Sequence, residues 1–269
     1  MLIWKNTTIL DTCSDGLSFT DIKNSTEIIL MGSQPIDINK FPNLKGIFRA
    51  GVGRDNVPEK EANENGIVVR YPSEETVNII FEETACFTCS LIFRMLYSDL
   101  GTVEPWAKEP RSQMSVKNLL VIGTGKIGSQ VVELMRPFIQ VSTFDMLQNE
   151  IFELKPMIQQ ADCITIHIPK SNNNISFFDR EKLSWMKDNS ALVNTARGAI
   201  VDEDALYNEI ANGRIRVAFD VYWQEPYQGK LKEFYPKLFY MTPHVASTCS
   251  EFLQGCREDL DQLIIELSD

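Results

Sequence analysis

The C-terminal part of this 269-residue chain contains a histidine, an arginine and a glutamate. Together, these residue types can bind an anion and transfer a proton next to it. His244 lies in Thr-Pro-His-Val-Ala-Ser and is one of only two histidines, while Arg197 lies in Asn-Thr-Ala-Arg-Gly and Glu225 precedes a proline. Histidine exchanges a proton readily near neutral pH, and the planar fork of arginine matches a carboxylate. Their order predicts proton transfer to or from an oxygen next to an anchored anionic group.

Each of these residues also has a structural interpretation. Arg197 could be a surface ion-pair partner, Glu225 a turn residue before proline, and His244 a histidine whose hydrogen bonds are satisfied within the fold. The three favour chemistry only in combination, and because they follow a glycine-rich loop.

That loop reads Gly-Thr-Gly-Lys-Ile-Gly over residues 123–128, between the apolar run 118–122 and a helical pattern. Its glycines permit a tight turn and a close approach of the backbone to a pyrophosphate, and the helix N-terminus supplies free N–H groups. Asp145 ends the next predicted strand, where it would accept hydrogen bonds from the adenosine ribose and repel a 2′-phosphate. The loop therefore predicts a dinucleotide site that prefers NAD to NADP. Lys126 would either contact a phosphate or stay solvated.

The segments that must position these residues alternate between strand and helix patterns. Strands are predicted at 26–31, 44–48, 66–70, 118–122, 140–144, 162–168, 190–194, 215–219 and 238–241, and helices at 58–65, 76–100, 126–136, 150–160, 179–187, 202–212 and 251–267. Such alternation is typical of parallel sheets with right-handed crossovers. Residues 101–115 lack periodicity and are interpreted as a linker or an arm between domains. Because ligands bind outside the carboxyl ends of parallel strands, the three candidate residues fall on the binding edge.

The bulk properties narrow the class of protein. A net charge of −11 argues against a nucleic-acid partner. The absence of a long apolar run and of a signal-peptide pattern predicts a cytoplasmic protein that does not bind membranes. The six cysteines, including the C-x-x-C at Cys86 and Cys89, form no metal-ligand pattern and are expected to be small buried residues.

These motifs, taken in order, resemble the D-isomer-specific 2-hydroxyacid dehydrogenase family. The resemblance covers nearly the whole chain and is carried by Arg49–Gly53 with Asp55-Asn56, Glu83, Gly123–Gly128, His167-Ile-Pro169, Asn194–Gly198, Val201–Leu206, Ala218–Val221 with Glu225-Pro226, and Thr242–Ser247. It implies an α/β fold of two Rossmann-like or flavodoxin-like domains, with doubly wound parallel sheets and a cleft between them. Residues 1–95 plus 248–269 would bind substrate, and residues 96–247 would bind NAD.

The resemblance also implies a role for each site residue. Arg197 would hold the substrate carboxylate, His244 would transfer the proton, and Glu225 would orient the imidazole and favour its charged form. The expected cofactor contacts are Gly123, Gly125, Lys126, Ile127, Gly128, Asp145, His167, Pro169, Thr195, Ala196 and Asp220, and the expected substrate contacts are Arg49, Val52, Gly53, Arg197 and His244. No metal is expected, and the family favours a homodimer.

The implied activity is hydride transfer between NAD(H) and a small 2-oxoacid or D-2-hydroxyacid. The segment from Arg49 to Val57 is especially similar to the phosphoglycerate dehydrogenase branch, which favours a phosphorylated substrate, with glyoxylate and hydroxypyruvate left open. Arg49 could instead only end a strand. A different class of function, an NADH-sensing binding protein similar to a corepressor, stays open too. The connection after Asp145 is shorter than is usual in the family.

Overall fold

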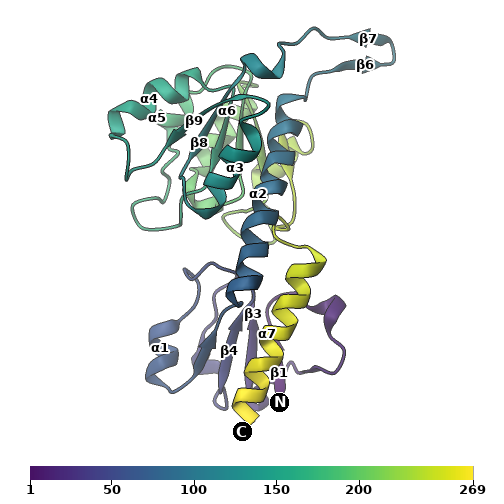
Figure 1. Ribbon diagram of the computed structural model, residues 1–269, viewed down its shortest axis with the longest axis vertical. Coiled ribbons are helices and arrows are strands. Elements are labelled where there is room, and N and C mark those ends of the chain that lie inside the picture. The colour runs from purple at the N-terminus through teal and green to yellow at the C-terminus, as the bar shows by residue number, and fades with distance from the viewer. Residues whose placement is uncertain (269) are drawn as a thin grey trace. The chain divides into compact units, whose positions relative to one another are not determined.

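The computed structural model describes residues 1–268, which fold into two compact units. The first unit contains residues 1–83 and the C-terminal segment from Ser247, and the second contains Thr84–Ala246. Helix α2 (Glu74–Leu96) contributes residues to both units. Figure 1 labels helices α1–α7 and those strands for which there is room.

The first unit is built on a five-stranded sheet in which every pairing is parallel, in the order β2-β1-β3-β4-β5. Its elements are β1 (Leu2–Lys5), β2 (Ser18–Phe19), β3 (Ile28–Met31), β4 (Gly46–Arg49), α1 (Glu59–Glu64), β5 (Val68–Arg70), the start of α2 and α7 (Ser250–Ser268). Alternate residues of β3 pack into different clusters, since Ile28 and Leu30 contact the α7 side and Ile29 and Met31 the α1 side. Both faces of the sheet are therefore covered, as parallel sheets require.

The second unit has a six-stranded parallel sheet in the order β13-β12-β11-β10-β8-β9. Its main elements are β8 (Asn118–Ile122), α3 (Lys126–Met135), β9 (Gln140–Phe144), α4 (Ile151–Gln160), β10 (Cys163–Ile166), α5 (Arg180–Ser184), β11 (Ser190–Asn194), α6 (Glu203–Ala211), β12 (Ile215–Phe219) and β13 (Phe239–Met241). Strand β8 again divides its residues, with Leu120 and Ile122 in one apolar cluster and Leu119 and Val121 in the other. Two helical layers thus cover this sheet.

Both sheets follow the same doubly wound order. In each sheet the first strand in the chain (β1 or β8) has the second strand (β2 or β9) on one side and the third strand (β3 or β10) on the other. The predicted α/β class with doubly wound parallel sheets is confirmed. In the second unit the order reverses between β8 and β10, and a crevice at such a switch point is where ligands bind in open α/β sheets.

The segment 101–115 differs from its predicted irregular character. It contains an antiparallel hairpin, β6 (Gly101–Val103) and β7 (Trp106–Lys108), which extends away from the sheet of its own unit (Figure 1). The remaining short elements are 3-10 turns at Asp11–Cys13, Lys23–Ser25, Ile38–Lys40, Met114–Val116, Gly198–Ile200 and Lys230–Phe234.

The prediction of buried cysteines is wrong for part of the set. Cys89, Cys163 and Cys256 are buried, but Cys86 is exposed, and Cys13 and Cys249 are partly exposed. Residues three apart on a helix lie only about 60° apart around its axis, so the edge of the buried face of α2 runs between Cys86 and Cys89. Among the described residues, no helix combines the length and the apolar character needed to cross a bilayer.

Candidate active site and cofactor cradle

The strand register of the second unit aligns the carboxyl ends of all six strands at one edge. The aligned pairs are Phe144 with Ile122, Ile122 with Ile166, Ile166 with Asn194, Asn194 with Phe219, and Phe219 with Met241. Neighbouring strands lie about 4.8 Å apart, so the edge extends over about 24 Å from β9 to β13. The loops that leave this edge carry all the predicted catalytic residues and the predicted phosphate loop.

His244 and Glu225 form a close pair on this edge. His244 Nδ1 lies 2.9 Å from Glu225 Oε1 and 2.8 Å from Oε2. The carboxylate is also fixed by the Tyr222 N–H, which donates to Oε1 at 3.2 Å. The carboxylate can only accept, so we assign the proton to Nδ1. Nε2 then remains for chemistry, since within residues 1–268 it has no hydrogen-bond partner.

The turn that carries His244 is held by a buried carboxylate. His244 has a φ of 55°, a left-handed conformation that a non-glycine residue keeps only when its surroundings enforce it. Asp220 accepts hydrogen bonds from Thr242 Oγ1 at 2.6 Å and from the N–H groups of Val245 and Ala246, both at 2.9 Å. Burial raises the pKa of the Asp220 carboxyl, although these hydrogen bonds oppose the shift. The carboxylate of Asp220 is thus used inside the protein, where it fixes the histidine turn.

Arg197 lies in the loop that follows strand β11, and the side chain of Asn194 stabilises this loop. The Asn194 side chain donates to the Arg197 carbonyl oxygen at 2.9 Å and accepts from the Ala196 N–H at 3.0 Å. The Arg197 side chain is partly buried, and its Nη1 donates to the Ala196 carbonyl oxygen at 2.8 Å. The loops after β11 and β13, two strands with β12 between them, therefore present a guanidinium and a carboxylate-supported imidazole at the same sheet edge.

The glycine loop has the shape of a phosphate cradle. Gly123 has a φ of 90°, and a Cβ there would lie 2.7 Å from the His167 carbonyl oxygen. A Cβ at Gly128 would lie 1.9 Å from the Gly123 carbonyl oxygen, so only glycine allows helix α3 to pack this close to the loop. Gly125 is exposed, and a Cβ there would meet no atom within 4 Å. As the N-cap of α3, Gly125 supplies no side-chain hydrogen bond, so the first turn of the helix keeps N–H groups for an anion.

Asp145 lies beside this cradle, directly after β9. Its Oδ2 accepts from Thr124 N at 2.8 Å and Thr124 Oγ1 at 2.9 Å, and its Oδ1 accepts from Leu147 N at 3.0 Å. The backbone hydrogen bonds from Thr124 and Leu147 lower the pKa of the Asp145 carboxyl, so it is ionised at neutral pH. A fixed, partly exposed anion at this position fits an adenosine ribose and disfavours a 2′-phosphate.

His167 lies on the other side of the switch point, after β10. Its Nε2 is 2.9 Å from Thr165 Oγ1, and burial of the ring lowers the pKa of His167 to about 3. A ring that stays neutral is a poor proton donor at neutral pH, which agrees with a cofactor contact rather than a catalytic acid. The nearby Pro169 is exposed, and its carbonyl oxygen accepts from Asn174 Nδ2 at 2.8 Å.

The remaining predicted cofactor contacts differ in their exposure. Lys126 is exposed at the first position of α3, whereas Ile127 is partly buried against the apolar cluster beneath the sheet. Thr195 is buried and its hydroxyl lies 2.8 Å from that of Thr88 on helix α2, while Ala196 is partly buried. Their contacts with a cofactor stay predictions.

The predicted substrate residues of the first unit follow strand β4. Arg49 is buried, and its Nη1 donates to the Ala50 carbonyl oxygen at 2.5 Å. Gly51 has a φ of 141°, and a Cβ there would lie 2.7 Å from the Arg49 guanidinium, so the glycine makes room for that side chain. The Gly51 N–H donates to the Arg49 carbonyl oxygen at 2.9 Å, which leaves the N–H groups of Val52 and Gly53 as the candidates for an anion.

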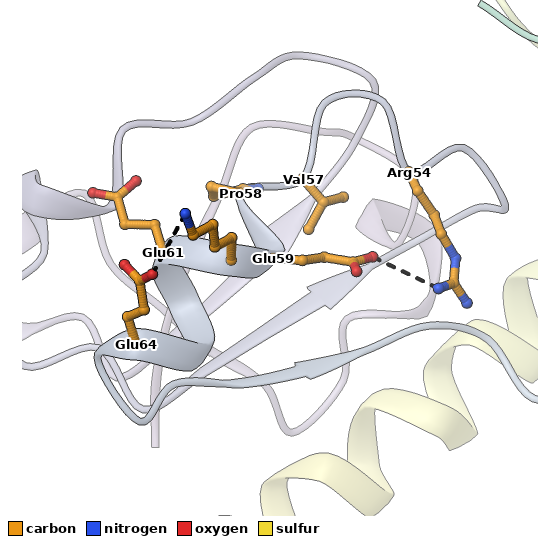
Figure 2. Close-up of a pocket in the computed structure, with 7 residues that line it drawn as sticks. Arg54, Val57, Pro58, Glu59, Glu61 and Glu64 are labelled. Carbon is orange, nitrogen blue, oxygen red and sulfur yellow. Dashed lines mark ion pairs between the residues drawn. The ribbon is translucent and has the colours of Figure 1, made fainter. Parts of the chain in front are cut away.

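A hollow of about 510 Å³ lies elsewhere on the first unit, over helix α1. It is lined by Arg54, Val57, Pro58, Glu59, Lys60, Glu61 and Glu64. Figure 2 shows Arg54 directed toward Glu59, with which it forms an ion pair of 3.7 Å. The hollow contains none of the predicted catalytic residues, and its two cations, Arg54 and Lys60, form ion pairs with Glu59 and Glu64 of the same lining.

Sequence patterns did not reveal the residues that support the catalytic pair. Tyr222 donates its N–H to Glu225 and places its hydroxyl 2.8 Å from the carbonyl oxygens of both Phe219 and Thr242. Thr124 and Thr242 likewise use their hydroxyls to fix carboxylates. The available signal was only their proximity in sequence to the motifs, because a threonine or tyrosine side chain has no fixed partner until the strands pair.

The family comparison agrees with this architecture. Residues 99–246 match the model of the D-isomer specific 2-hydroxyacid dehydrogenase NAD binding domain, which is more than half of the chain.

The chain belongs to the D-isomer-specific 2-hydroxyacid dehydrogenase family.

Relatives of the family differ in how much of their own length the chain matches. A D-3-phosphoglycerate dehydrogenase from Synechocystis sp. is 31% identical over 85% of the chain, but the match spans only 42% of that relative. A glyoxylate reductase from Korarchaeum cryptofilum is 28% identical over 86% of the chain and 76% of its own length. The solved D-lactate dehydrogenase from Aquifex aeolicus, complexed with NAD and lactic acid, shares the fold with a TM-score of 0.79 at 21% identity, covering 100% of this chain and 95% of that one.

NAD is the cofactor that this domain of the family binds. The cradle of the present chain fits it, because the open N-terminus of α3 suits a pyrophosphate and the ionised Asp145 suits a ribose. Gly123 and Gly125 would let the backbone approach the phosphates, and Gly128 would let α3 pack close to the loop.

Proposed function

We propose that the protein is an NAD-dependent dehydrogenase that interconverts a small 2-oxoacid and the corresponding D-2-hydroxyacid. The observation that carries the proposal is the contact of His244 Nδ1 with both oxygens of Glu225, on the sheet edge that also presents Arg197 and the NAD cradle. The named relatives are dehydrogenases and reductases, and none of them supports the alternative of an NADH-sensing binding protein.

The chemistry that NAD(H) supplies when bound is the transfer of a hydride. Arg197 binds the substrate carboxylate through its guanidinium fork and polarises the adjacent 2-oxo group. His244 donates the Nε2 proton to the carbonyl oxygen during reduction and takes it back during oxidation. Glu225 holds the ring through Nδ1 and compensates the positive charge of the imidazolium. Asp220 holds the turn on which the ring is mounted.

The choice of 2-oxoacid depends on the first unit. We propose that the N–H groups of Val52 and Gly53 bind the substrate carboxylate, and that Arg49 binds a second anionic group where the substrate has one. A phosphate or second carboxylate would use the Arg49 guanidinium, whereas glyoxylate has no group to offer it. The candidates are therefore 3-phosphohydroxypyruvate, hydroxypyruvate and glyoxylate.

A substrate panel followed by the loss of NADH absorbance tests the proposal. We expect turnover of at least one of the three 2-oxoacids, and a loss of more than about a thousandfold in His244→Gln with NADH affinity retained. A preference for 3-phosphohydroxypyruvate that Arg49→Gln abolishes would support the phosphate interpretation. Absence of turnover with every 2-oxoacid, or unchanged turnover in His244→Gln, would refute the proposed function.

We further propose that the protein is a cytoplasmic homodimer. The support for the dimer comes from the β6–β7 hairpin, on which Val103 and Trp106 are 73% and 81% exposed. An isolated two-stranded hairpin is only marginally stable in water, and covering its apolar side chains with a second copy would stabilise it. Sedimentation of the wild type and of Trp106→Ser tests this, because the variant should shift to monomer.

A further inference from the structure

The Asp145 carboxylate has little hydrogen-bonding capacity left for a ribose. A carboxylate offers about four acceptor positions, two on each oxygen. Oδ2 uses both of its positions on Thr124, one for the N–H at 2.8 Å and one for the hydroxyl at 2.9 Å. Oδ1 accepts from Leu147 N at 3.0 Å. Among the described residues, Asp145 therefore keeps one open position, on Oδ1.

The adenosine ribose of NAD carries two hydroxyls, and both need acceptors when they leave water. A second acceptor must therefore lie close to the single open position of Asp145. Thr124 Oγ1 is that atom, because its proton is committed to Oδ2 and its lone pairs are left to accept. Gln148 Nε2 approaches this oxygen only at 3.5 Å, the limit of a hydrogen bond.

The fold places Thr124 beside Asp145 through the pairing of two strands. Ile122 of β8 is in register with Phe144 of β9, and the Gly123 N–H donates to the Phe144 carbonyl oxygen at 2.8 Å. Thr124 and Asp145 follow directly, and both side chains are partly exposed at the sheet edge. A ligand that contacts one of them can reach the other.

We propose that Thr124 and Asp145 form a composite ribose site, in which Asp145 Oδ1 accepts one adenosine ribose hydroxyl and Thr124 Oγ1 accepts the other. The inference rests on the proposed use of NAD, and it adds Thr124 to the residues that bind it. The second position of the glycine loop thus contributes a side chain, and not only backbone, to cofactor recognition.

Binding titrations of the full chain test the composite site without using turnover. Calorimetry would compare NADH with two analogues that lack either the 2′- or the 3′-hydroxyl of the adenosine ribose. Thr124→Val removes the hydroxyl at nearly constant volume, and Thr124→Ser retains it. Ser129→Ala is the matched control, because the Ser129 hydroxyl donates to the Thr124 carbonyl oxygen at 2.7 Å from the same loop.

We expect Thr124→Val to weaken NADH binding about five- to tenfold, the effect of one net hydrogen bond. Thr124→Ser and Ser129→Ala should stay within about twofold of the wild type. For one of the two deoxy analogues, Thr124→Val and the wild type should have the same affinity. That analogue lacks the ribose hydroxyl that donates to Thr124 Oγ1, so the substitution removes no hydrogen bond.

Three results would overturn the composite site. The first is an unchanged NADH affinity in Thr124→Val, and the second is a loss of NADH affinity in Thr124→Ser as large as that in Thr124→Val. The third is that Thr124→Val weakens the binding of both analogues equally, which would mean that Thr124 only orients Asp145. Failure of the proposed dehydrogenase function would give a different result, in which the wild-type chain binds NADH but reduces no 2-oxoacid. The binding titrations would still decide the role of Thr124 in that case.

Discussion

Glu225→Gln removes the negative charge beside the His244 imidazole and changes little else. The two Nδ1 contacts of 2.9 and 2.8 Å show that both carboxylate oxygens face the ring. A glutamine can keep one acceptor there, but it presents an NH₂ group in place of the second oxygen. The substitution therefore tests the stabilisation of the imidazolium and keeps the shape of the side chain.

The magnitude follows from the geometry and the exposure of the pair. Two unit charges about 4 Å apart interact by about 4 kcal/mol at an effective dielectric constant of about 20. The His244 and Glu225 side chains are 33% and 19% exposed, so solvent screens part of this energy. We expect about 1–2 kcal/mol to remain, which corresponds to about a five- to thirtyfold loss of kcat for reduction.

The assay is steady-state NADH oxidation with the preferred 2-oxoacid, measured for both proteins at the same neutral pH. Glu203→Gln is the control, since the Glu203 carboxylate accepts from the Tyr227 hydroxyl at 2.6 Å and does not touch His244. A kcat within twofold of the wild type, or an equal loss in the control, would refute the reasoning.

Three further perturbations address the turn, the cradle and the buried ring. Asp220→Asn removes acceptor capacity for the turn of His244 and should lower kcat about tenfold. The affinity for NADH, measured by calorimetry, should change by less than twofold. A large loss of affinity would instead indicate that Asp220 contacts the cofactor directly. Gly128→Ala should lower the free energy of unfolding by about 1–3 kcal/mol in urea, because its Cβ would lie 1.9 Å from a carbonyl oxygen, whereas Gly125→Ala should leave it unchanged. Burial lowers the pKa of His167 from 6.5 to about 3, so between these values the unfolded chain binds a proton that the folded chain does not, and stability falls as the pH drops below about 6.5. His167→Gln should therefore lose less unfolding free energy than the wild type between about pH 7 and 5, and equal losses would contradict the shift.

The elements around the site followed from local patterns. Strands 118–122, 140–144, 190–194 and 215–219 have the predicted bounds. Apolar residues predominate in three of them, whereas 140–144 is largely polar and only its last residue, Phe144, is buried. Strands β1 and β2 escaped prediction, since they have four and two residues and only one of these is fully buried. The hairpin at β6 and β7 was missed too, because its exposed side chains leave no periodic apolar pattern.

The sequence alone determined the α/β class, through the alternation of strand and helix patterns. It also determined which residue types follow the strands, and hence the candidates Arg197, Glu225 and His244. Periodicity and motif order suffice for this, because they depend only on the chain itself. The tertiary structure alone decided where each side chain points. It turned the Asp220 carboxylate inward onto the histidine turn and committed the Thr124 hydroxyl to Asp145. Such partners come from strands far apart in sequence, and they become neighbours only when the sheet register is formed.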